Sequence, residues 1–247
     1  MFCPSAVEQG PVRGEDPGAR LLAGLCVDSM ETRRYYTPEE VAAHNSAGDL
    51  WVSVFHRVLN LTDLVREHRG ELTVPLIEAA GQDISHWFDE KTGNVKTRID
   101  PGKGIRLPYT PQGRFLHVAP AEPTANWSTK IANPWWQDEN LVIGKLTQKT
   151  RKVQIVNVIS QQTDLLTVCS EETISEIRDR YMEYNRHASS YTWKKLAQGT
   201  FVLLDMEKTL AENGVVDESE EFEELGIEDD FYYPILHVYF NDDLTVA

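Results

Sequence analysis

The pattern of polar and apolar residues predicts regular structure from Arg34 onward. Thr37 is typical of a helix N-cap, because Pro38 occupies the first helical position and Glu40 completes a capping box. This helix is expected to end near Asn45. A capped helix at this point indicates that the ordered part of the chain begins here.

Two short strands and a second helix are expected next. The residues at 51–54 and 57–60 are mainly apolar, and the Phe55-His56 pair between them predicts a tight turn. A helix is then expected from 61 to 68. A further strand is predicted much later, at 141–146.

The last third of the chain has its own pattern. Four strands are expected, at 153–159, 165–168, 191–196 and 235–240. Between the second and third strands, Thr173 and Glu176 form a capping box. The apolar residues of that helix are spaced 3, 4 and 3 apart: Ile174, Ile177, Tyr181 and Tyr184. The order hairpin, helix and two later strands predicts a second α+β unit.

The segment between the two patterns is rich in proline. Six prolines fall between Pro101 and Pro134, which predicts a long irregular segment. It is followed or interrupted by large aromatic residues, which favour an ordered loop packed on a surface: Phe115, Trp127, Trp135 and Trp136. The tryptophans are expected to be exposed and to anchor a partner protein.

These patterns predict three regions. Residues 1–33 have no periodicity and are expected to form a disordered arm. Residues 34–150 form a first domain with an insertion at about 95–138, and residues 151–247 form a second domain. Because strand and helix patterns restart at Val153, each domain is expected to have its own core.

Composition and charge exclude several classes. Hydrophobic residues make up 41% and charged residues 26%, as in an ordinary globular protein. The longest apolar run, 21–27, is far shorter than the roughly 20 residues of a membrane span, and no signal peptide is indicated. A net charge of −15 argues against binding to nucleic acid or an anionic membrane. Three widely spaced cysteines favour a reducing, cytosolic setting.

Acidic residues are concentrated in one stretch, 212–230, which holds ten carboxylates in nineteen residues and no base. It is interpreted as a solvated, flexible insertion in the second domain, because its spacing does not match an EF-hand loop. The alternatives are a docking surface for a basic partner and a weak calcium site.

Histidine is the residue type with the most chemical potential here, with seven in the chain. None lies in H-E-x-x-H or in a Cys/His zinc pattern. The chain also lacks G-x-S-x-G, a P-loop and G-x-G-x-x-G, so hydrolase, nucleotide-binding and dehydrogenase functions have no motif to support them.

Residues 35–93 resemble the cytochrome b5 haem-binding domain. The matching segments are Tyr35-Tyr36-Thr37-Pro38-Glu39-Glu40-Val41 with His44-Asn45, then Trp51-Val52, Arg57 to Thr62, Glu67-His68-Arg69-Gly70, and Ala80-Gly81-Gln82-Asp83 with Trp87-Phe88. Val142 to Leu146 resembles the family's closing strand. The resemblance implies a b5-like fold and haem b, ligated by two imidazoles, which favours electron transfer over oxygen chemistry.

The resemblance also indicates which residues would ligate the iron. His68 matches the first ligand position, although the family's P-G-G is replaced by Arg69-Gly70-Glu71. At the second position this chain has Gly93-Asn94 and no imidazole. His86 and His117 are the two alternatives for that role, and each is also compatible with a purely structural role.

The second domain resembles ubiquitin, a β-grasp fold, from its second strand to the bend before its last strand. No terminal Gly-Gly follows, so conjugation is not expected. The combination with a b5-like domain and an aromatic insertion resembles a family of proteins of cilia and flagella. It implies a non-enzymatic protein of the cytoplasm and cytoskeleton, in the axoneme, with radial-spoke partners.

Two functions therefore remain open. In the first, a haem serves redox sensing or a structural role in a ciliary assembly. In the second, a scaffold keeps the b5 fold without haem and docks partners through its aromatic loop and acidic stretch. A third function, electron transfer to a membrane enzyme, is less expected, because the sequence pattern predicts no C-terminal membrane anchor.

Overall fold

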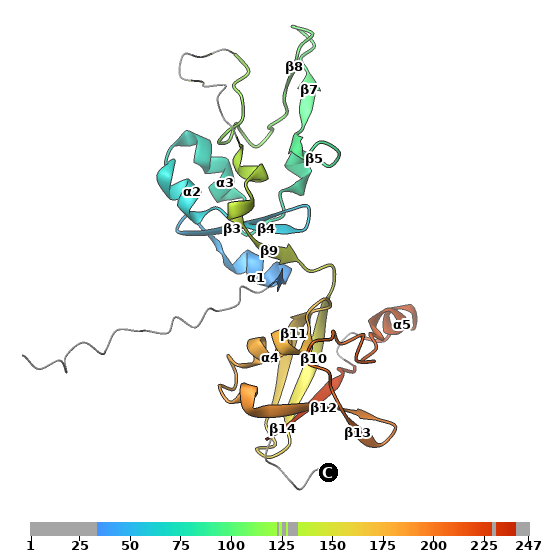
Figure 1. Ribbon diagram of the computed structural model, residues 1–247. Coiled ribbons are helices and arrows are strands. Elements are labelled where there is room, and N and C mark those ends of the chain that lie inside the picture. The colour runs from blue at the N-terminus through green and yellow to red at the C-terminus, as the bar shows by residue number, and fades with distance from the viewer. Residues whose placement is uncertain (1–33, 123, 125–126, 128–132, 229–230, 241–247) are drawn as a thin grey trace, which may run out of the picture. The chain divides into compact units, whose positions relative to one another are not determined.

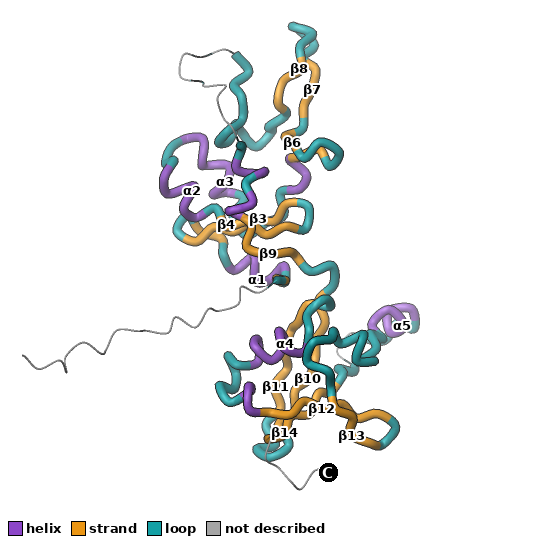
Figure 2. The backbone as a smooth tube through the Cα atoms, viewed as in Figure 1, coloured by secondary structure: helices purple, strands orange, loops and turns teal. Residues whose placement is uncertain are grey.

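The computed structural model describes residues 34–122, 124, 127, 133–228 and 231–240. Its helices and two main sheets confirm the predicted α+β class (Figures 1 and 2). The arm predicted for residues 1–33 lies outside the described residues. All the described residues belong to one compact unit, and the domain boundary expected near residue 150 stays a prediction.

The first sheet has five strands in the order β1–β9–β4–β3–β2. They are β1 (Tyr35–Tyr36), β2 (Asn45–Ser46), β3 (Asp49–Val54), β4 (Arg57–Asn60) and β9 (Val142–Leu146). The predicted turn is confirmed, with Phe55 and His56 at φ values of 47° and 61°. Gly144 of β9 cannot be replaced without rearrangement, because a Cβ there would lie 2.6 Å from the ring of Tyr36. Since β9 pairs with both β4 and β1, the chain between β4 and β9 is inserted into one sheet.

Three short helices accompany this sheet: α1 (Pro38–Ala43), α2 (Thr62–Glu67) and α3 (Val74–Glu78), the last preceded by η1 (Glu71–Thr73). Helices α2 and α3 lie on the same side of β3 and β4 in Figure 1. The capping box of α1 is present as predicted, because Thr37 accepts from Glu40 N–H and the Glu40 carboxylate accepts from Thr37 N–H. Helix α2 ends at His68, its C-cap residue.

The insertion is more regular than expected. It contains the hairpin β7 (Thr97–Ile99) with β8 (Arg106–Pro108) and the 3-10 turn η3 (Trp135–Gln137). The 3-10 turn η2 (Ser85–Trp87) and the hairpin β5 (Phe88–Asp89) with β6 (Asn94–Val95) lead into it, and η4 (Glu139–Leu141) follows it. Proline and glycine content alone did not predict these hairpins. They pair locally, with two to three residues a strand.

The aromatic residues of the insertion lie in the core of this first half. Phe115 is 0% exposed, Trp135 1% and Trp136 6%, and they pack with Trp87 and Phe88. The expectation that Trp135 and Trp136 are exposed anchors for a partner is therefore wrong. The physical reason is that burying a large apolar ring in the core removes its surface from water and stabilises the fold, whereas a ring on an exposed loop stays in water.

The second sheet has the order β11–β10–β14–β12–β13, with its central pair β10 and β14 parallel. Its elements are β10 (Thr150–Asn157), β11 (Thr163–Cys169), α4 (Ile174–Tyr181), η5 (Ala188–Ser190), β12 (Tyr191–Ala197), β13 (Thr200–Leu203) and β14 (Ile235–Phe240). With one helix between its second and third strands, this is the predicted β-grasp topology. The capping box of Thr173 and Glu176 is present, and Ile174, Ile177 and Tyr181 are fully buried.

A buried ion-pair network connects α4 to α1. The guanidinium of Arg180, 5% exposed, donates to both carboxylate oxygens of Glu172, to those of Glu40 and to the carbonyl of Tyr35. Burial alone would lower the pKa of Arg180, but the two carboxylates more than offset this and raise it. A buried charge is costly without partners, so the buried Arg180 guanidinium depends on the carboxylates of both Glu172 and Glu40. Burial also raises the pKa of the adjacent Cys169 thiol to about 12.

The acidic stretch contains a short helix, α5 (Ser219–Glu224), in the part that the structure describes. Lys149 pairs with Asp217 at 2.8 Å and with Glu220 at 3.4 Å. The carboxylates of α5 are on exposed residues, as expected for a solvated insertion.

Candidate functional site

His68 lies at the C-terminal end of α2, and its ring is fixed by its own helix. Its Nδ1 lies 3.1 Å from the carbonyl oxygen of Leu64, which also accepts the His68 main-chain N–H. Because a carbonyl only accepts, Nδ1 must carry the proton in this bond. The neutral ring then has a lone pair on Nε2, and the residue is exposed.

His117 comes from the insertion and has the opposite hydrogen-bond arrangement. The main-chain N–H of Trp135 donates to its Nδ1 at 3.0 Å. The residue has a φ of 68°, in the left-handed region that residues other than glycine seldom adopt. Burial, with a smaller contribution from His68, lowers the pKa of His117. This lowering of the pKa favours the neutral form of the ring.

The structure brings His68 and His117 together, although 49 positions separate them in the sequence. Their ring centroids lie 6.3 Å apart, and the rings are nearly perpendicular at 81°. This separation is of the order that two imidazoles need to reach one metal ion, whose bonds to histidine nitrogen are about 2 Å long. Of the three predicted histidines, His68 and His117 are thus the two that lie close enough to reach one metal ion.

His86 is not part of this pair. It lies exposed on η2, and its ring meets the edge of Trp87 at 6.1 Å. Among the described residues, no ring contact joins it to His68 or His117. The prediction that it ligates iron stays a prediction.

Haem, the group that the b5 resemblance implies, fits His68 and does not fit His117 as arranged. Ligating histidines almost always donate their other ring N–H to an acceptor, which leaves a lone pair for the metal. His68 does so through Leu64, whereas His117 accepts at the nitrogen that would have to donate. Sequence reasoning missed Trp135 as the residue that decides this. The only signal was an aromatic pair after a proline.

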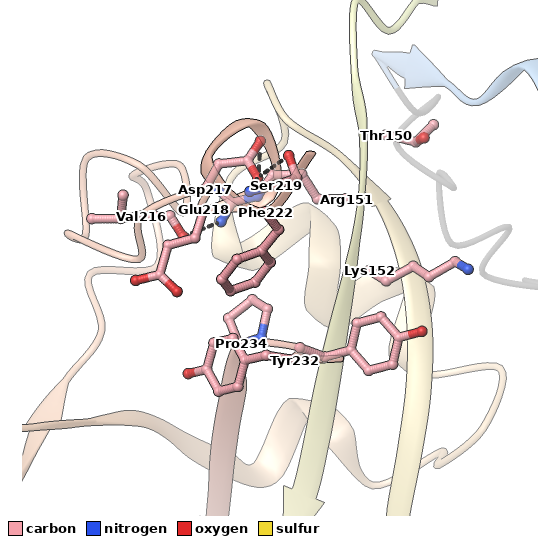
Figure 3. Close-up of a pocket in the computed structure, with 11 residues that line it drawn as sticks. Thr150, Arg151, Lys152, Val216, Asp217, Glu218, Ser219, Phe222, Tyr232 and Pro234 are labelled. Atoms are coloured by element: carbon pink, nitrogen blue, oxygen red, sulfur yellow. Dashed lines mark hydrogen bonds and ion pairs between the residues drawn. The ribbon is translucent and has the colours of Figure 1, made fainter. Parts of the chain in front are cut away.

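A separate cavity of about 200 Å³ opens beside α5 (Figure 3). Phe222 and Pro234 face each other in it. Arg151 in its wall is buried, and its guanidinium donates to the carbonyls of Val215 and Val216 at 3.1 and 2.8 Å. The protein itself already uses this cation, and none of the three histidines lines the cavity.

The fold of residues 34–150 and the position of His68 in it are those expected of a cytochrome b5-like domain. Residues 37–98 match the family model described as "Cytochrome b5-like Heme/Steroid binding domain". In the part of the chain that the structure describes, none of the helices has the length and apolar character needed to cross a bilayer.

Relatives match nearly the whole chain. Cytochrome b5 domain-containing protein 1 of Xenopus laevis is 54% identical over 213 residues, which cover 86% of this chain and 96% of that protein. The human protein of the same name is 46% identical over 230 residues, covering 93% and 99%. A Delta(8)-fatty-acid desaturase of Helianthus annuus is 41% identical over 56 residues, only 23% of this chain and 12% of that one. The chain belongs to the family of Cytochrome b5 domain-containing protein 1.

Replacing each buried tryptophan with phenylalanine tests whether the Trp135 indole holds the insertion in place. Its Nε1–H donates to the buried carbonyl of Leu116 at 3.1 Å, whereas the Nε1 of Trp136 is buried without a partner. Trp135→Phe should lower the free energy of unfolding by about 1–3 kcal/mol more than Trp136→Phe, because it leaves an unpaired carbonyl. Both variants lose the same volume, so each controls for the other. Equal losses in urea denaturation would contradict this account.

Proposed function

We propose that this chain is a haem-binding, non-catalytic subunit of the ciliary or flagellar axoneme, associated with radial spokes and supporting ciliary motility. One observation carries the haem-binding part: His68 stands at the family's ligand position with Nδ1 fixed on Leu64 and a lone pair on Nε2. The axonemal part is supported by the resemblance of nearly all of residues 34–247 to a family of ciliary proteins.

The group proposed is haem b, held by His68 without covalent attachment, since the sequence has no C-x-x-C-H. When bound, haem supplies a one-electron redox centre. The residues supply binding and orientation, because the Leu64 carbonyl fixes the tautomer of His68. Redox sensing within the axoneme is the role proposed for it.

A specific observation favours a second candidate, the haem-free scaffold. The insertion packs Phe115, Trp135 and Trp136 into the same core as the residues of β3 and α3. An apolar core that is filled by its own side chains is stable without a bound group. In this function the b5 fold serves as a rigid support for partner binding.

Titration of the full chain with haemin distinguishes the two functions. His68→Ala should weaken haemin binding by more than about 100-fold, because loss of a ligand exceeds the roughly 10–100-fold cost of losing a ligand's hydrogen-bond partner. His86→Ala is the matched control and should bind as the parent does. Absence of a Soret band in the parent after reconstitution would favour the scaffold. If His86→Ala lost haemin binding and His68→Ala did not, the iron ligand would be His86 and the assignment to His68 would be wrong.

Assembly is proposed to use the acidic helix α5 as an electrostatic contact with a basic partner. Its exposed carboxylates raise the encounter rate with such a partner, and salt screens this effect. The buried tryptophans have no part in it.

Charge removal on α5 tests this contact in isolated, detergent-washed axonemes. The triple change Glu221→Gln, Glu223→Gln and Glu224→Gln should release the protein at lower salt than the parent. The matched control removes three exposed carboxylates of the first half, with Glu67→Gln, Glu78→Gln and Glu90→Gln, and should not. A parent protein that washes out with detergent would refute the axonemal assignment, and equal release of both variants would refute the role of α5.

A further inference from the structure

Basic residues are concentrated in one segment of this acidic chain. Residues 91–114 contain six lysines and arginines and one carboxylate, so the segment carries +5 whereas the whole chain carries −15. One described carboxylate, that of Glu122, pairs with Nζ of Lys103 at 3.0 Å. Among the described residues, no carboxylate lies within ion-pair distance of the other five cations, which are Lys91, Lys96, Arg98, Arg106 and Arg114.

The centre of this basic segment is the β7–β8 hairpin, which pairs with no other described strand. In Figure 1 the hairpin extends away from β3 and β4. All three residues of β7 are exposed, and Ile99 keeps 66% of its surface in water. A ribbon of two strands is marginally stable by itself, so a third strand would stabilise it.

The outer edge of β7 presents main-chain groups to such a strand. The N–H of Asp100 donates to the carbonyl of Ile105 at 2.9 Å, so this pair is one of those that exchange hydrogen bonds across the hairpin. Because such pairs alternate along an antiparallel ladder, Arg98 belongs to the next one. The N–H and C=O groups of Thr97 and Ile99 therefore point away from β8.

The two faces of this edge differ in chemistry. Side chains alternate along a strand, so Lys96 and Arg98 lie on one face, and Thr97 and Ile99 lie on the other. Opposite charges on directly facing residues stabilise a strand pair, and like charges destabilise it. A strand of alternating acidic and apolar residues therefore fits this edge. A second copy of β7 does not, because it would bring cations against cations.

We propose that the outer edge of β7 binds an extended segment of a partner protein in which carboxylates alternate with apolar residues. The segment adds a strand to the hairpin through the main chain of Thr97 and Ile99. Its carboxylates pair with Lys96 and Arg98, and its apolar residues cover Ile99. The inference goes beyond the proposed function, because neither haem nor α5 takes part in it.

Other polyanions fit the edge less well. Nucleic acid has no peptide main chain that could continue a β-ladder. The residues outside the basic segment together carry −20, which opposes the approach of a long, uniformly charged polymer. The tip of the hairpin, 101–104, is Pro-Gly-Lys-Gly and has no large apolar side chain to enter a bilayer.

Fluorescence anisotropy of a labelled EVEVEVE peptide, titrated with the full chain, tests the proposal. As a strand, this peptide has glutamates on one face and valines on the other. The parent should bind it at least about tenfold more tightly than EEVVVEE, which has the same composition but cannot add main-chain bonds while keeping both faces matched. Amide hydrogen exchange, followed by NMR, should slow at Thr97 and Ile99 and stay unchanged at Arg98.

Charge reversal tests the cationic face. Lys96→Glu with Arg98→Glu should weaken EVEVEVE binding by about tenfold or more, because each change converts an attractive cross-strand pair into a repulsive one. The matched control is Lys145→Glu with Arg186→Glu, which changes the net charge equally at exposed positions outside the hairpin. Its affinity should stay within about twofold of the parent, since salt screens charges at a distance.

Two changes at Ile99 separate main-chain from side-chain contacts. Ile99→Pro removes the outward N–H, which the hairpin itself does not use, whereas Ile99→Thr keeps this N–H and removes the large apolar side chain. Binding should be lost in Ile99→Pro and largely kept in Ile99→Thr. The reverse order would show a side-chain contact without strand addition and would overturn the proposal.

Three further results would overturn it. The first is equal affinity of the parent for the two peptides, or no affinity for either. The second is binding to duplex DNA or to phosphatidylserine vesicles, lost on reversal of Lys96 and Arg98, without binding of EVEVEVE. The third is exchange at Thr97 and Ile99 that slows with protein concentration in the absence of peptide, which would make the occupant a second copy of the chain.

Discussion

The arrangement of the candidate site depends on one residue that donates twice. The two N–H groups of Trp135 bond to adjacent residues, the indole to the Leu116 carbonyl and the main chain to Nδ1 of His117. These bonds join the end of the insertion to its middle, inside a core where an unpaired carbonyl would be costly. They also fix the ring of His117 beside His68. The packing of the insertion therefore also determines which ring nitrogen of His117 carries the proton.

Whether each imidazole can ligate a metal depends on the direction of its hydrogen bond more than on the distance between the rings. A separation of 6.3 Å between two imidazoles suggests a shared metal ion, but the neighbours of each ring decide whether it offers a lone pair or a proton. His68 has an acceptor behind it, and His117 has a donor. One histidine of the pair thus has the hydrogen-bond partner that a metal-ligating imidazole needs, and the other does not.

Local signals predicted much of the fold, and long-range packing explains what they missed. The capping boxes at Thr37 and Thr173 were readable because both partners lie three residues apart. The short strands of the β7–β8 hairpin have no comparable pattern, and their pairing was missed. The burial of Trp135 was also missed, since exposure depends on residues far away in the sequence. His68 and His117 were both named as candidates from the sequence, but the contact between them was not predicted, because 49 positions separate them and no local pattern links them.

The central claim is that His68 and His117 have opposite ring polarities, and nitrogen NMR of the haem-free protein tests it most directly. Long-range proton–nitrogen correlation distinguishes a protonated ring nitrogen from one with a lone pair. The account predicts a protonated Nδ1 and an unprotonated Nε2 in His68, and the reverse in His117, with His117→Asn assigning the second set of signals. A protonated Nδ1 in His117 would contradict the account, because the Trp135 bond would then be absent.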